Sequence, residues 1–567
     1  MNKTPSYREL PDKIFPYAAV CLMAFFACIT LFLRDGWPYN HDGDAVFKSA
    51  RVFKDLVYRY HDFFPTWSAY GSYSMGSPMP FFYHHLDFYL ISLIDLIFNN
   101  MLISVKFSVF LLLSLGGTAV YLTVSKLFNN RFYGITSAGL YIFSSYIYTE
   151  WLVRGAHSEF AASVIFVWIL FVFSRTAFQF SSFNFLILGL LLSLLLYAHT
   201  LVFMFVLFSF AIFILANTSE WLKHPLRPAP GLIIPVITGL PYVIPYLTFR
   251  NLFNMEKPIM AFPVRDNFIE IYRYFFDNHY NMGETWQAFS VEIGRFYVLP
   301  LILIMMIFII RKRSVLPWKP ARDVQPFKKY ILFVLSALIF YIILINKFTL
   351  PFYDAVPFIK YIQFPWRLLC LITPLAIILF IYYADSATML FTRINGEKAV
   401  RFGLGLILFI QAVWVGGNYE FYRYKSFSSR EIAESMSNEN LRSHFNWDEY
   451  MPLDFKKKDN ASILENSGLS VISSSDPDLF SSIRDFGSVH IMLSPGGKGT
   501  IVFNQLSSPF IKLSFTSNII VSKGASGEAV FSQVDDGSNS FIDIKKRGLF
   551  DLDCYCVEKL LRGDQKL

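Results

Sequence analysis

The sequence predicts a polytopic α-helical membrane protein with about eleven transmembrane helices and a C-terminal, non-cytoplasmic domain of β-sandwich type. Of the 567 residues, 54% are hydrophobic and only 16% are charged, whereas roughly 25% of residues are charged in average soluble proteins. Long uncharged stretches recur through the first 417 residues, and 37 of the 92 charged side chains fall in the last 150 residues. We therefore place a membrane domain at 1–417 and a mainly β soluble domain at 418–567.

The first predicted span is the uncharged stretch 15–33, which is long enough to cross a hydrocarbon core about 30 Å thick. No small-residue cleavage site ends it, so we interpret it as an uncleaved span with a cytoplasmic amino end rather than a signal peptide. Ten further spans are predicted at 101–124, 132–149, 160–174, 183–198, 200–216, 231–248, 296–310, 330–346, 366–384 and 402–417.

A shorter apolar segment, 86–98, contains Asp87 and Asp95, which favours an interfacial or re-entrant element over a span. If this segment does not cross, the predicted inner segments hold 18 Lys and Arg in about 79 residues. The outer loops between spans, together with Arg367 at the start of the tenth span, hold 14 in about 145. That bias is typical of cytoplasmic loops, so we expect a multi-pass protein of the cell inner membrane. The periplasmic or extracellular parts are then 34–100, 150–159, 249–295, 347–365 and the tail after 417.

The first outer loop, 34–100, begins with the acidic turn Asn40-His41-Asp42-Gly43-Asp44. Apolar residues recur at helical spacing over 45–60 with basic side chains opposite, which predicts an amphipathic helix in the headgroup plane. Asp44 stands where a helix N-cap belongs, so capping and catalysis both remain open for it. Asp42 is the stronger functional candidate, because a carboxylate at the end of a transmembrane segment must be solvated, form an ion pair or have a functional role.

Two arginines are candidate ligands for a phosphate group. Arg154 and Arg367 each lie at the outer end of a predicted span beside a Gly or Pro turn, and a guanidinium group can bind phosphate through two hydrogen bonds. The alternative for either arginine is a lipid headgroup contact or an ion pair with Glu150 or Glu159. Lys360 is a lesser candidate, for which an interface anchor is the simpler interpretation.

Four short motifs recur in an order that matches a known group of membrane proteins. They are Trp67 with Gly76-Ser-Pro-Met-Pro-Phe-Phe-Tyr83, Arg154-Gly-Ala-His-Ser-Glu159, Gln363-Phe-Pro-Trp-Arg367 and Glu449-Tyr-Met-Pro452. With the acidic first loop, they resemble the GT-C superfamily of membrane glycosyltransferases, and more closely the bacterial YfhO-like, or 6-pyruvoyl-tetrahydropterin synthase-related, membrane proteins. The resemblance covers most of the chain, although the tail matches only at the last motif. It implies a helical bundle with an outer active site and a polyprenyl-phosphate-linked sugar donor, and it implies no pterin chemistry.

Sugar transfer from such a donor needs a base for the acceptor hydroxyl and cations for the leaving phosphate. We expect Asp42 to be the base and Asp44 its partner or the helix cap, and the resemblance supports the acidic motif as the catalytic position. The expected substrate-binding residues are Arg154, His157, Glu159, Arg367, Tyr83 and Lys360. A divalent cation is a possible cofactor, with oxygen and imidazole ligands from His41, Asp42, Asp44, His157 and Glu159.

The sequence thus predicts a hexosyl- or pentosyltransferase that acts at the outer face of the cytoplasmic membrane, in contact with membrane lipids. Its acceptor would be a glycan, a lipid or a protein. A transporter of lipids or lipid-linked glycans is a second hypothesis, disfavoured because the mid-span regions hold few ionisable residues. A non-catalytic subunit of a cell-envelope polysaccharide assembly system is a third. Nucleic-acid binding is excluded, since no basic cluster with interleaved aromatics stands on a polar segment.

The tail changes character near residue 467. Short β-like runs alternate there with Gly- and Ser-rich turns, which predicts an antiparallel β-sandwich. The runs are 488–493, 500–503, 510–515, 519–521, 529–531 and 540–544. These runs contain no recognisable group of catalytic residues.

Overall fold

The chain divides into two compact units. The computed structural model describes residues 9–59, 61–68, 77–83, 85–250, 253, 260–277, 289–310, 324–356, 359–388, 396–419 and 426–437, and strands between 471 and 546. Unit 1 comprises Met1–Gly43, Phe98–Val236 and Phe262–Ser429, and unit 2 comprises Asp44–Ile97, Ile237–Ala261 and Arg430–Leu567. The predicted domain boundary at 417 stays a prediction.

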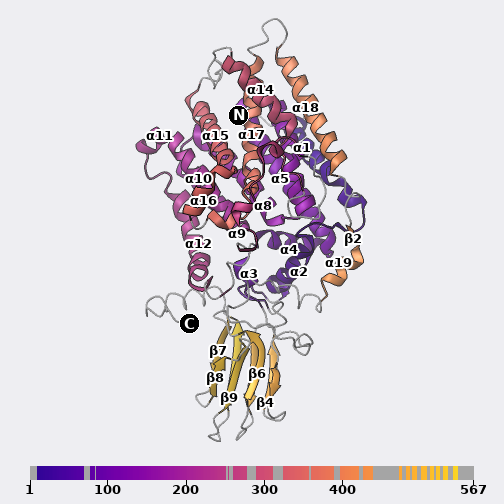
Figure 1. Cartoon of the computed structure of the whole chain (residues 1–567), viewed down its shortest axis with the longest axis vertical. Helices are drawn as coiled ribbons and strands as arrows, with labels where there is room; N and C mark the ends of the chain where they lie inside the picture. Colours follow the sequence, from indigo (N-terminus) through magenta and orange to yellow (C-terminus); the bar gives the residue numbers. More distant parts are fainter. Residues whose placement is uncertain are drawn as a thin grey trace, which may run out of the picture. The chain divides into compact units, whose positions relative to one another are not determined.

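Most of the described chain is helical (Figure 1). The longer helices are α1 (Glu9–Leu33), α5 (Met101–Phe128), α6 (Arg131–Ile142), α8 (His157–Phe178), α9 (Ser182–Ala198), α10 (Thr200–Ala216), α12 (Ala229–Phe249), α14 (Arg295–Ile310), α15 (Gln325–Leu344), α17 (Leu369–Ala387) and α18 (Gly396–Asn418). The short ones are α7 (Ser145–Tyr148), α11 (Thr218–Lys223), α16 (Leu350–Ala355), α19 (Ser429–Ser435), the π-helical turn η2 (Thr149–Arg154) and the 3-10 turns η4 (Val264–Asp266), η5 (Ile271–Tyr274), η7 (Lys347–Thr349), η8 (Ile359–Ile362) and η9 (Pro365–Leu368).

Helix α17 is the core helix of unit 1. All of its residues are buried, and it packs against α6, α8, α14, α15 and α18. Its sequence is apolar on every side, which is typical of a helix enclosed by other helices. By contrast, α18 leaves Phe402, Phe409 and Val413 exposed, as expected of a helix that faces lipid.

Seven helices in the described part of the chain are long and apolar enough to cross a membrane, so this is a membrane protein. They are Ile14–Leu33, Met101–Phe128, His157–Phe178, Ala229–Phe249, Gln325–Leu344, Pro365–Ala387 and Gly396–Asn418. Helices α9, α10 and α14 occupy three more of the predicted spans but are only 16 or 17 residues long. The total of eleven spans stays a prediction.

The predicted span 132–149 is not one continuous helix, which corrects the sequence-based expectation. Helix α6 ends at Ile142, and α7 and η2 follow it. The chain breaks because Ser144 adopts an extended conformation and its hydroxyl donates a hydrogen bond to the carbonyl of Ile293 at 3.3 Å. A serine hydroxyl that bonds a distant carbonyl gives the backbone an alternative to continuing the helix.

A small β-bridge joins the start of the first outer loop to the segment after α18 within unit 1. Strand β1 (Trp37–Pro38) pairs with β2 (Ser426–Phe427), and the Asp35 carboxylate accepts hydrogen bonds from Ser429. Gly36 has a φ of +78°, and a Cβ atom there would lie 1.8 Å from the carbonyl oxygen of Phe427. Only glycine therefore allows this close approach.

In unit 2, the predicted amphipathic helix is α2 (Gly43–Lys54), which continues as the π-helical turn η1 (Asp55–Arg59). Its apolar face packs against α4 (Leu86–Phe98), where Phe53 contacts Phe88 with ring centroids 5.5 Å apart. Lys54 pairs with Asp95 of α4 at 2.5 Å. The apolar side of α2 is thus covered by protein, whereas the sequence predicted a helix whose apolar face lies in the headgroup plane.

Helix α4 is 13 residues long and is not among the span-length helices of the described chain. This length agrees with the non-spanning interpretation of 86–98. The next short helix along the Gly-Pro-aromatic segment is α3 (Met79–Phe82), where Phe82 packs against Tyr246 and Phe253 at 5.7 and 5.2 Å between ring centroids.

The described part of the tail forms two four-stranded antiparallel sheets, with strand orders β4-β5-β10-β7 and β3-β6-β9-β8. The strands are β3 (Val471–Ser474), β4 (Phe480–Asp485), β5 (Ser488–Leu493), β6 (Thr500–Leu506), β7 (Ile511–Phe515), β8 (Ile519–Lys523), β9 (Glu528–Gln533) and β10 (Ser540–Lys546). Each predicted β-run coincides with one of β5 to β10. The Ser-rich β3 and β4 were not predicted, and the sandwich arrangement of the sheets stays a prediction.

Candidate functional site

The acidic turn of the first outer loop is held against the turn that precedes α8. The Asn40 side chain donates a hydrogen bond to the carbonyl of Leu152 at 3.2 Å, and the backbone N–H of Asp42 donates to the carbonyl of Arg154 at 2.9 Å. Gly155 has a φ of +67°, and a Cβ atom there would lie 2.6 Å from the side-chain oxygen of Asn40. These contacts place Asp42 directly beside Arg154 along the backbone.

The turn that receives Asp42 is the π-helical η2, which runs from Thr149 to Arg154 and ends at Gly155 in the left-handed conformation. The N–H of Ala156 closes the turn on the carbonyl of Glu150 at 2.9 Å, and the Thr149 hydroxyl donates to the carbonyl of Ser290 at 2.9 Å. Single π-helical turns are uncommon and frequently occur at functional sites. Here the turn carries Glu150 and Arg154 into the same buried region.

Two arginines share one glutamate at this site. The Arg154 guanidinium donates two hydrogen bonds to the carboxylate of Glu159, both at 2.9 Å, and Arg367 Nε lies 3.4 Å from the same carboxylate. The Tyr146 hydroxyl adds a third hydrogen bond to Glu159 at 3.1 Å. The Arg154 guanidinium also lies 4.8 Å from the centre of the Trp366 ring. We call Arg154, Glu159 and Arg367 the arginine–glutamate cluster.

The two arginines of the cluster differ in how accessible they are. The side chains of Arg154 and Glu159 are 5% and 2% exposed, whereas that of Arg367 is 21% exposed. Both carboxylate oxygens of Glu159 are already hydrogen bonded to Arg154. Arg367 is therefore the arginine that can reach an added anion without breaking a buried pair.

The surroundings of Asp42 raise its pKa, which makes its carboxylate a stronger base than that of an exposed aspartate. Burial raises the pKa of Asp42 above the ordinary carboxyl value, while the positive charges of Arg154 and Arg367 lower it in part. A higher pKa strengthens a general base, and the nearby cations favour its ionised form. Burial also lowers the pKa of His41 to about 4, so His41 is neutral at pH 7.

Asp44 occupies a different setting from the one the sequence predicted. Helix α2 begins at Gly43, so Asp44 lies inside its first turn instead of standing at the N-cap. Its carboxylate forms an ion pair with Lys48, one turn later, at 2.6 Å. The helix begins directly after Asp42, whose backbone N–H is bonded to the carbonyl of Arg154 at 2.9 Å.

Two buried groups at the site had weak sequence signals. Glu150 is fully buried, and its carboxyl group lies next to that of Glu159. Burial raises the pKa of Glu150 well above its usual range, and the charge of Glu159 raises it further. His157 is also buried, and among the described residues neither of its ring nitrogens has a partner. The sequence predicted His157 as a site residue, but it indicated Glu150 only as an ion-pair partner for the arginines.

Three side chains lie close enough to share a metal ion, namely Glu150, Glu159 and Cys370, whose ligand atoms are all within 4.8 Å of one another. Of the predicted ligands, only Glu159 belongs to this group. As arranged, the group does not suit a resident cation, because both oxygens of Glu159 already bind Arg154 and a cation would have to displace that guanidinium. Cys370 had no sequence signal, since it lies in an apolar stretch.

The structure gives less information on the remaining predicted residues. Tyr83 belongs to unit 2, where its ring stacks on Phe88 with centroids 6.1 Å apart. The backbone of Lys360 lies in η8, and its side chain falls outside the described residues. The motif 449–452 and residues 69–76 also lie outside the described part of the chain.

No protein-family model matches the sequence, and no curated protein matches it. Among solved structures, the chain is similar to the oligosaccharyltransferase of Archaeoglobus fulgidus in its apo form, with 13% identity and a TM-score of 0.40 over 75% of this chain. The oligosaccharyltransferase AglB of Archaeoglobus fulgidus, in complex with an inhibitory peptide and a dolichol-phosphate, matches with the same identity, TM-score and coverage. A structure of the first protein with Zn and sulfate matches with 14% identity and a TM-score of 0.38. The chain spans 56% of the first of these proteins. Scores at this level do not establish a shared fold.

Proposed function

We propose that this chain is an integral membrane glycosyltransferase of the GT-C type, related to the YfhO-like membrane proteins. It transfers a hexose or pentose from a polyprenyl-phosphate-linked donor to an acceptor glycan, lipid or protein, at the outer face of the cytoplasmic membrane. The observation that carries the proposal is the position of Asp42, a carboxylate held beside two arginines that share a single glutamate. The motifs Arg154–Glu159 and Gln363–Arg367, noted for their family resemblance, supply those arginines and that glutamate.

Asp42 is the general base in this proposal. Its carboxylate takes the proton from the acceptor hydroxyl while the acceptor oxygen forms a bond to the anomeric carbon of the sugar. The bond between that carbon and the phosphate oxygen breaks, and its electron pair stays on the polyprenyl phosphate. The raised pKa of Asp42 suits this role, because proton transfer is most efficient when the pKa of the base approaches the working pH.

Arg367 binds the phosphate of the donor, and Arg154 positions the site. Arg367 is the more exposed arginine, and its contact with Glu159 is the longer one at 3.4 Å. A guanidinium can replace such a contact with two hydrogen bonds to a phosphate, and it then stabilises the charge that develops on the leaving group. Arg154 remains bound to Glu159, and its backbone carbonyl holds the amide of Asp42.

The other predicted residues have supporting roles. His157 carries unbonded ring nitrogens beside Glu159 in the first turn of α8 and can bind a sugar hydroxyl. Asp44, two residues after Asp42, is proposed as its catalytic partner, and Tyr83 and Lys360 are proposed to bind the substrates. Arg367 supplies positive charge for the leaving phosphate, so we propose that transfer does not require a divalent cation.

The test is a transfer assay with the purified full chain in proteoliposomes, using a panel of polyprenyl-phosphate-linked hexoses and pentoses with membrane extract as acceptor. We expect transfer with at least one donor, lost in Asp42→Asn and retained in Asp354→Asn. Asp354 is an exposed aspartate of α16 and serves as the matched control. Full transfer by Asp42→Asn would refute the assigned base. Donor movement across the bilayer without transfer would instead support a transporter.

A further inference from the structure

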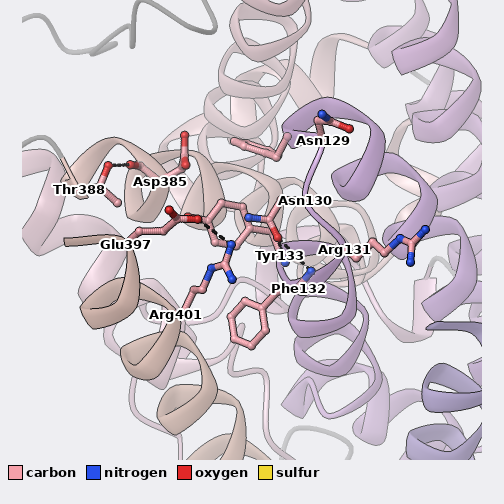
Figure 2. A pocket seen from close by; sticks show the side chains of 10 residues that line it. Asn129, Asn130, Arg131, Phe132, Tyr133, Asp385, Thr388, Glu397 and Arg401 are labelled. Atoms are coloured by element: carbon pink, nitrogen blue, oxygen red, sulfur yellow. Dashed lines mark hydrogen bonds and ion pairs between the residues drawn. The ribbon is translucent and has the colours of Figure 1, made fainter. Parts of the chain in front are cut away.

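Unit 1 contains a cavity far from the arginine–glutamate cluster. Its volume is about 750 Å³, and its walls are the turn between α5 and α6 on one side and the facing ends of α17 and α18 on the other (Figure 2). Helix α17 begins two residues after Arg367 and ends two residues after Asp385, which lines the cavity. At 1.5 Å per residue, Arg367 and Asp385 are roughly 27 Å apart along the helix axis. The cavity and the proposed active site therefore lie at opposite ends of the core helix.

The cavity carries both signs of charge. Asp385, at the end of α17, is 5% exposed, and Thr388 follows it with its hydroxyl bonded to the Asp385 carbonyl at 2.8 Å. On α18, Glu397 and Arg401 form an ion pair at 2.6 Å and are 59% and 47% exposed. Figure 2 shows this pair beside the α5–α6 turn, where the Asn130 side chain caps α6. Arg131 of α6 also lines the cavity, so two arginines and two carboxylates line one polar hollow.

The position of the cavity limits what can fill it. It lies at the ends of three helices that are long enough to span a membrane, α5, α17 and α18, and therefore at the depth of lipid headgroups. Its volume falls within the range of about 300–1,000 Å³ that is typical of small-molecule sites. Phe128 and Phe132 add apolar surface on the side of the turn. A lipid headgroup satisfies these conditions of depth, size and mixed polarity.

The mixed charge favours a zwitterion over an anion. A purely anionic group would meet Arg131 and Arg401 but would also approach the carboxylates of Asp385 and Glu397, and like charges at short range repel. A group with both a phosphate and a primary ammonium matches both signs, because the phosphate accepts hydrogen bonds from a guanidinium and the ammonium donates to a carboxylate. A trimethylated ammonium has no N–H group to donate.

We propose that this cavity binds a phosphate–ammonium group, the headgroup of an aminophospholipid, with the phosphate on Arg401 and the ammonium on Asp385. The site is separate from sugar transfer and does not depend on the proposed function. It gives the protein a specific lipid contact on the membrane face opposite the arginine–glutamate cluster. Because α17 runs from two residues after Arg367 to the cavity, the bound headgroup also stabilises the core helix at the end opposite that cluster.

The test measures lipid binding to the purified full chain in detergent by native mass spectrometry and by thermal unfolding. The probes are short-chain phosphatidylethanolamine, phosphatidylcholine and phosphatidylglycerol, with soluble phosphoethanolamine as the free source of the same chemistry. We expect phosphatidylethanolamine to bind about tenfold more tightly than the other two lipids, as one charge-assisted hydrogen bond gained or lost would produce. Equal binding of the three lipids would overturn the proposal, and binding of phosphoethanolamine without the lipid would overturn the lipid as its source.

The matched variants are Arg401→Gln and Arg430→Gln. Both arginines pair with a glutamate four residues away on an exposed helix face, Arg401 with Glu397 at 2.6 Å and Arg430 with Glu434 at 2.8 Å, but only Arg401 lines the cavity. We expect Arg401→Gln to lose the preference for phosphatidylethanolamine and Arg430→Gln to keep it. Asp385→Asn, in protein that unfolds at the wild-type temperature, is expected to bind phosphatidylethanolamine and phosphatidylcholine equally. Identical lipid binding by the two arginine variants would refute the site.

Discussion

Replacing Asp42 by asparagine separates the chemical role of this side chain from any structural one. The substitution keeps the size of the side chain. It also leaves unaltered the 2.9 Å hydrogen bond from the backbone N–H of residue 42 to the carbonyl of Arg154. It removes the carboxylate that takes the proton. A positioned general base contributes about 10²–10⁴-fold to a rate, so we expect kcat to fall by this factor, equivalent to about 3–5 kcal/mol of transition-state stabilisation.

The Asp42→Asn variant should lose activity without losing folding stability. Because burial raises the folded-state pKa of Asp42, the folded protein holds this proton more tightly than the unfolded chain does. Ionisation of Asp42 therefore costs folding free energy as the pH rises from the unfolded pKa through the folded one, and the full cost is present above the folded pKa. Asparagine carries no charge, so at pH 7 we expect a Tm equal to or above that of the wild type.

The pH dependence of transfer gives an independent check on the same residue. With Asp42 as base, kcat/KM should rise with pH through the pKa of Asp42, which lies above the ordinary value of 3.8. The residual activity of Asp42→Asn should lack this acid limb. Radiolabelled sugar transfer in proteoliposomes from pH 4 to 9, with Asp354→Asn as the control, measures both effects. An unchanged acid limb in the variant, or a large loss of Tm with an unchanged rate per folded molecule, would refute the assignment.

Three further results are expected. Arg367→Gln should raise KM for the lipid-linked donor by about tenfold or more, from the loss of a charged hydrogen bond. Arg154→Gln should lower the free energy of unfolding by about 3–5 kcal/mol, because it leaves Glu159 buried without its main partner. Donor titration and thermal unfolding distinguish the two variants, and equal effects of both on KM and Tm would contradict the division of roles. Gly155→Ala should lower both Tm and the transfer rate. A φ of +67° costs alanine about 1–2 kcal/mol of backbone strain, and the new Cβ atom would lie 2.6 Å from the side chain of Asn40. Wild-type values in unfolding and transfer assays would show that the acidic turn is not held there. Chelation by EDTA should leave transfer intact, and a loss restored by added Mg²⁺ or Mn²⁺ would point to a metal-dependent reaction.

Patterns within one element could be predicted well from the sequence. The uncharged stretches located helices at every predicted span, since apolar length is a local property of the chain. Alternating apolar runs likewise located β5 to β10. The same local signals failed at Ser144, where a hydrogen bond to Ile293 ends the helix, because that partner lies 149 residues away in the sequence.

The candidate site shows the same division more sharply. By itself, the sequence identified Asp42, Arg154, Glu159 and Arg367 as chemical groups at the ends of apolar segments, and its charge distribution predicted that these ends face outward. Only the tertiary structure decided that Glu159 binds both arginines, that Asn40 holds the acidic turn on η2, and that Arg367 is the accessible cation. Residue type and the tendency to be buried can be predicted from each segment alone. The partner of a buried charge, in contrast, depends on which distant segments pack around it.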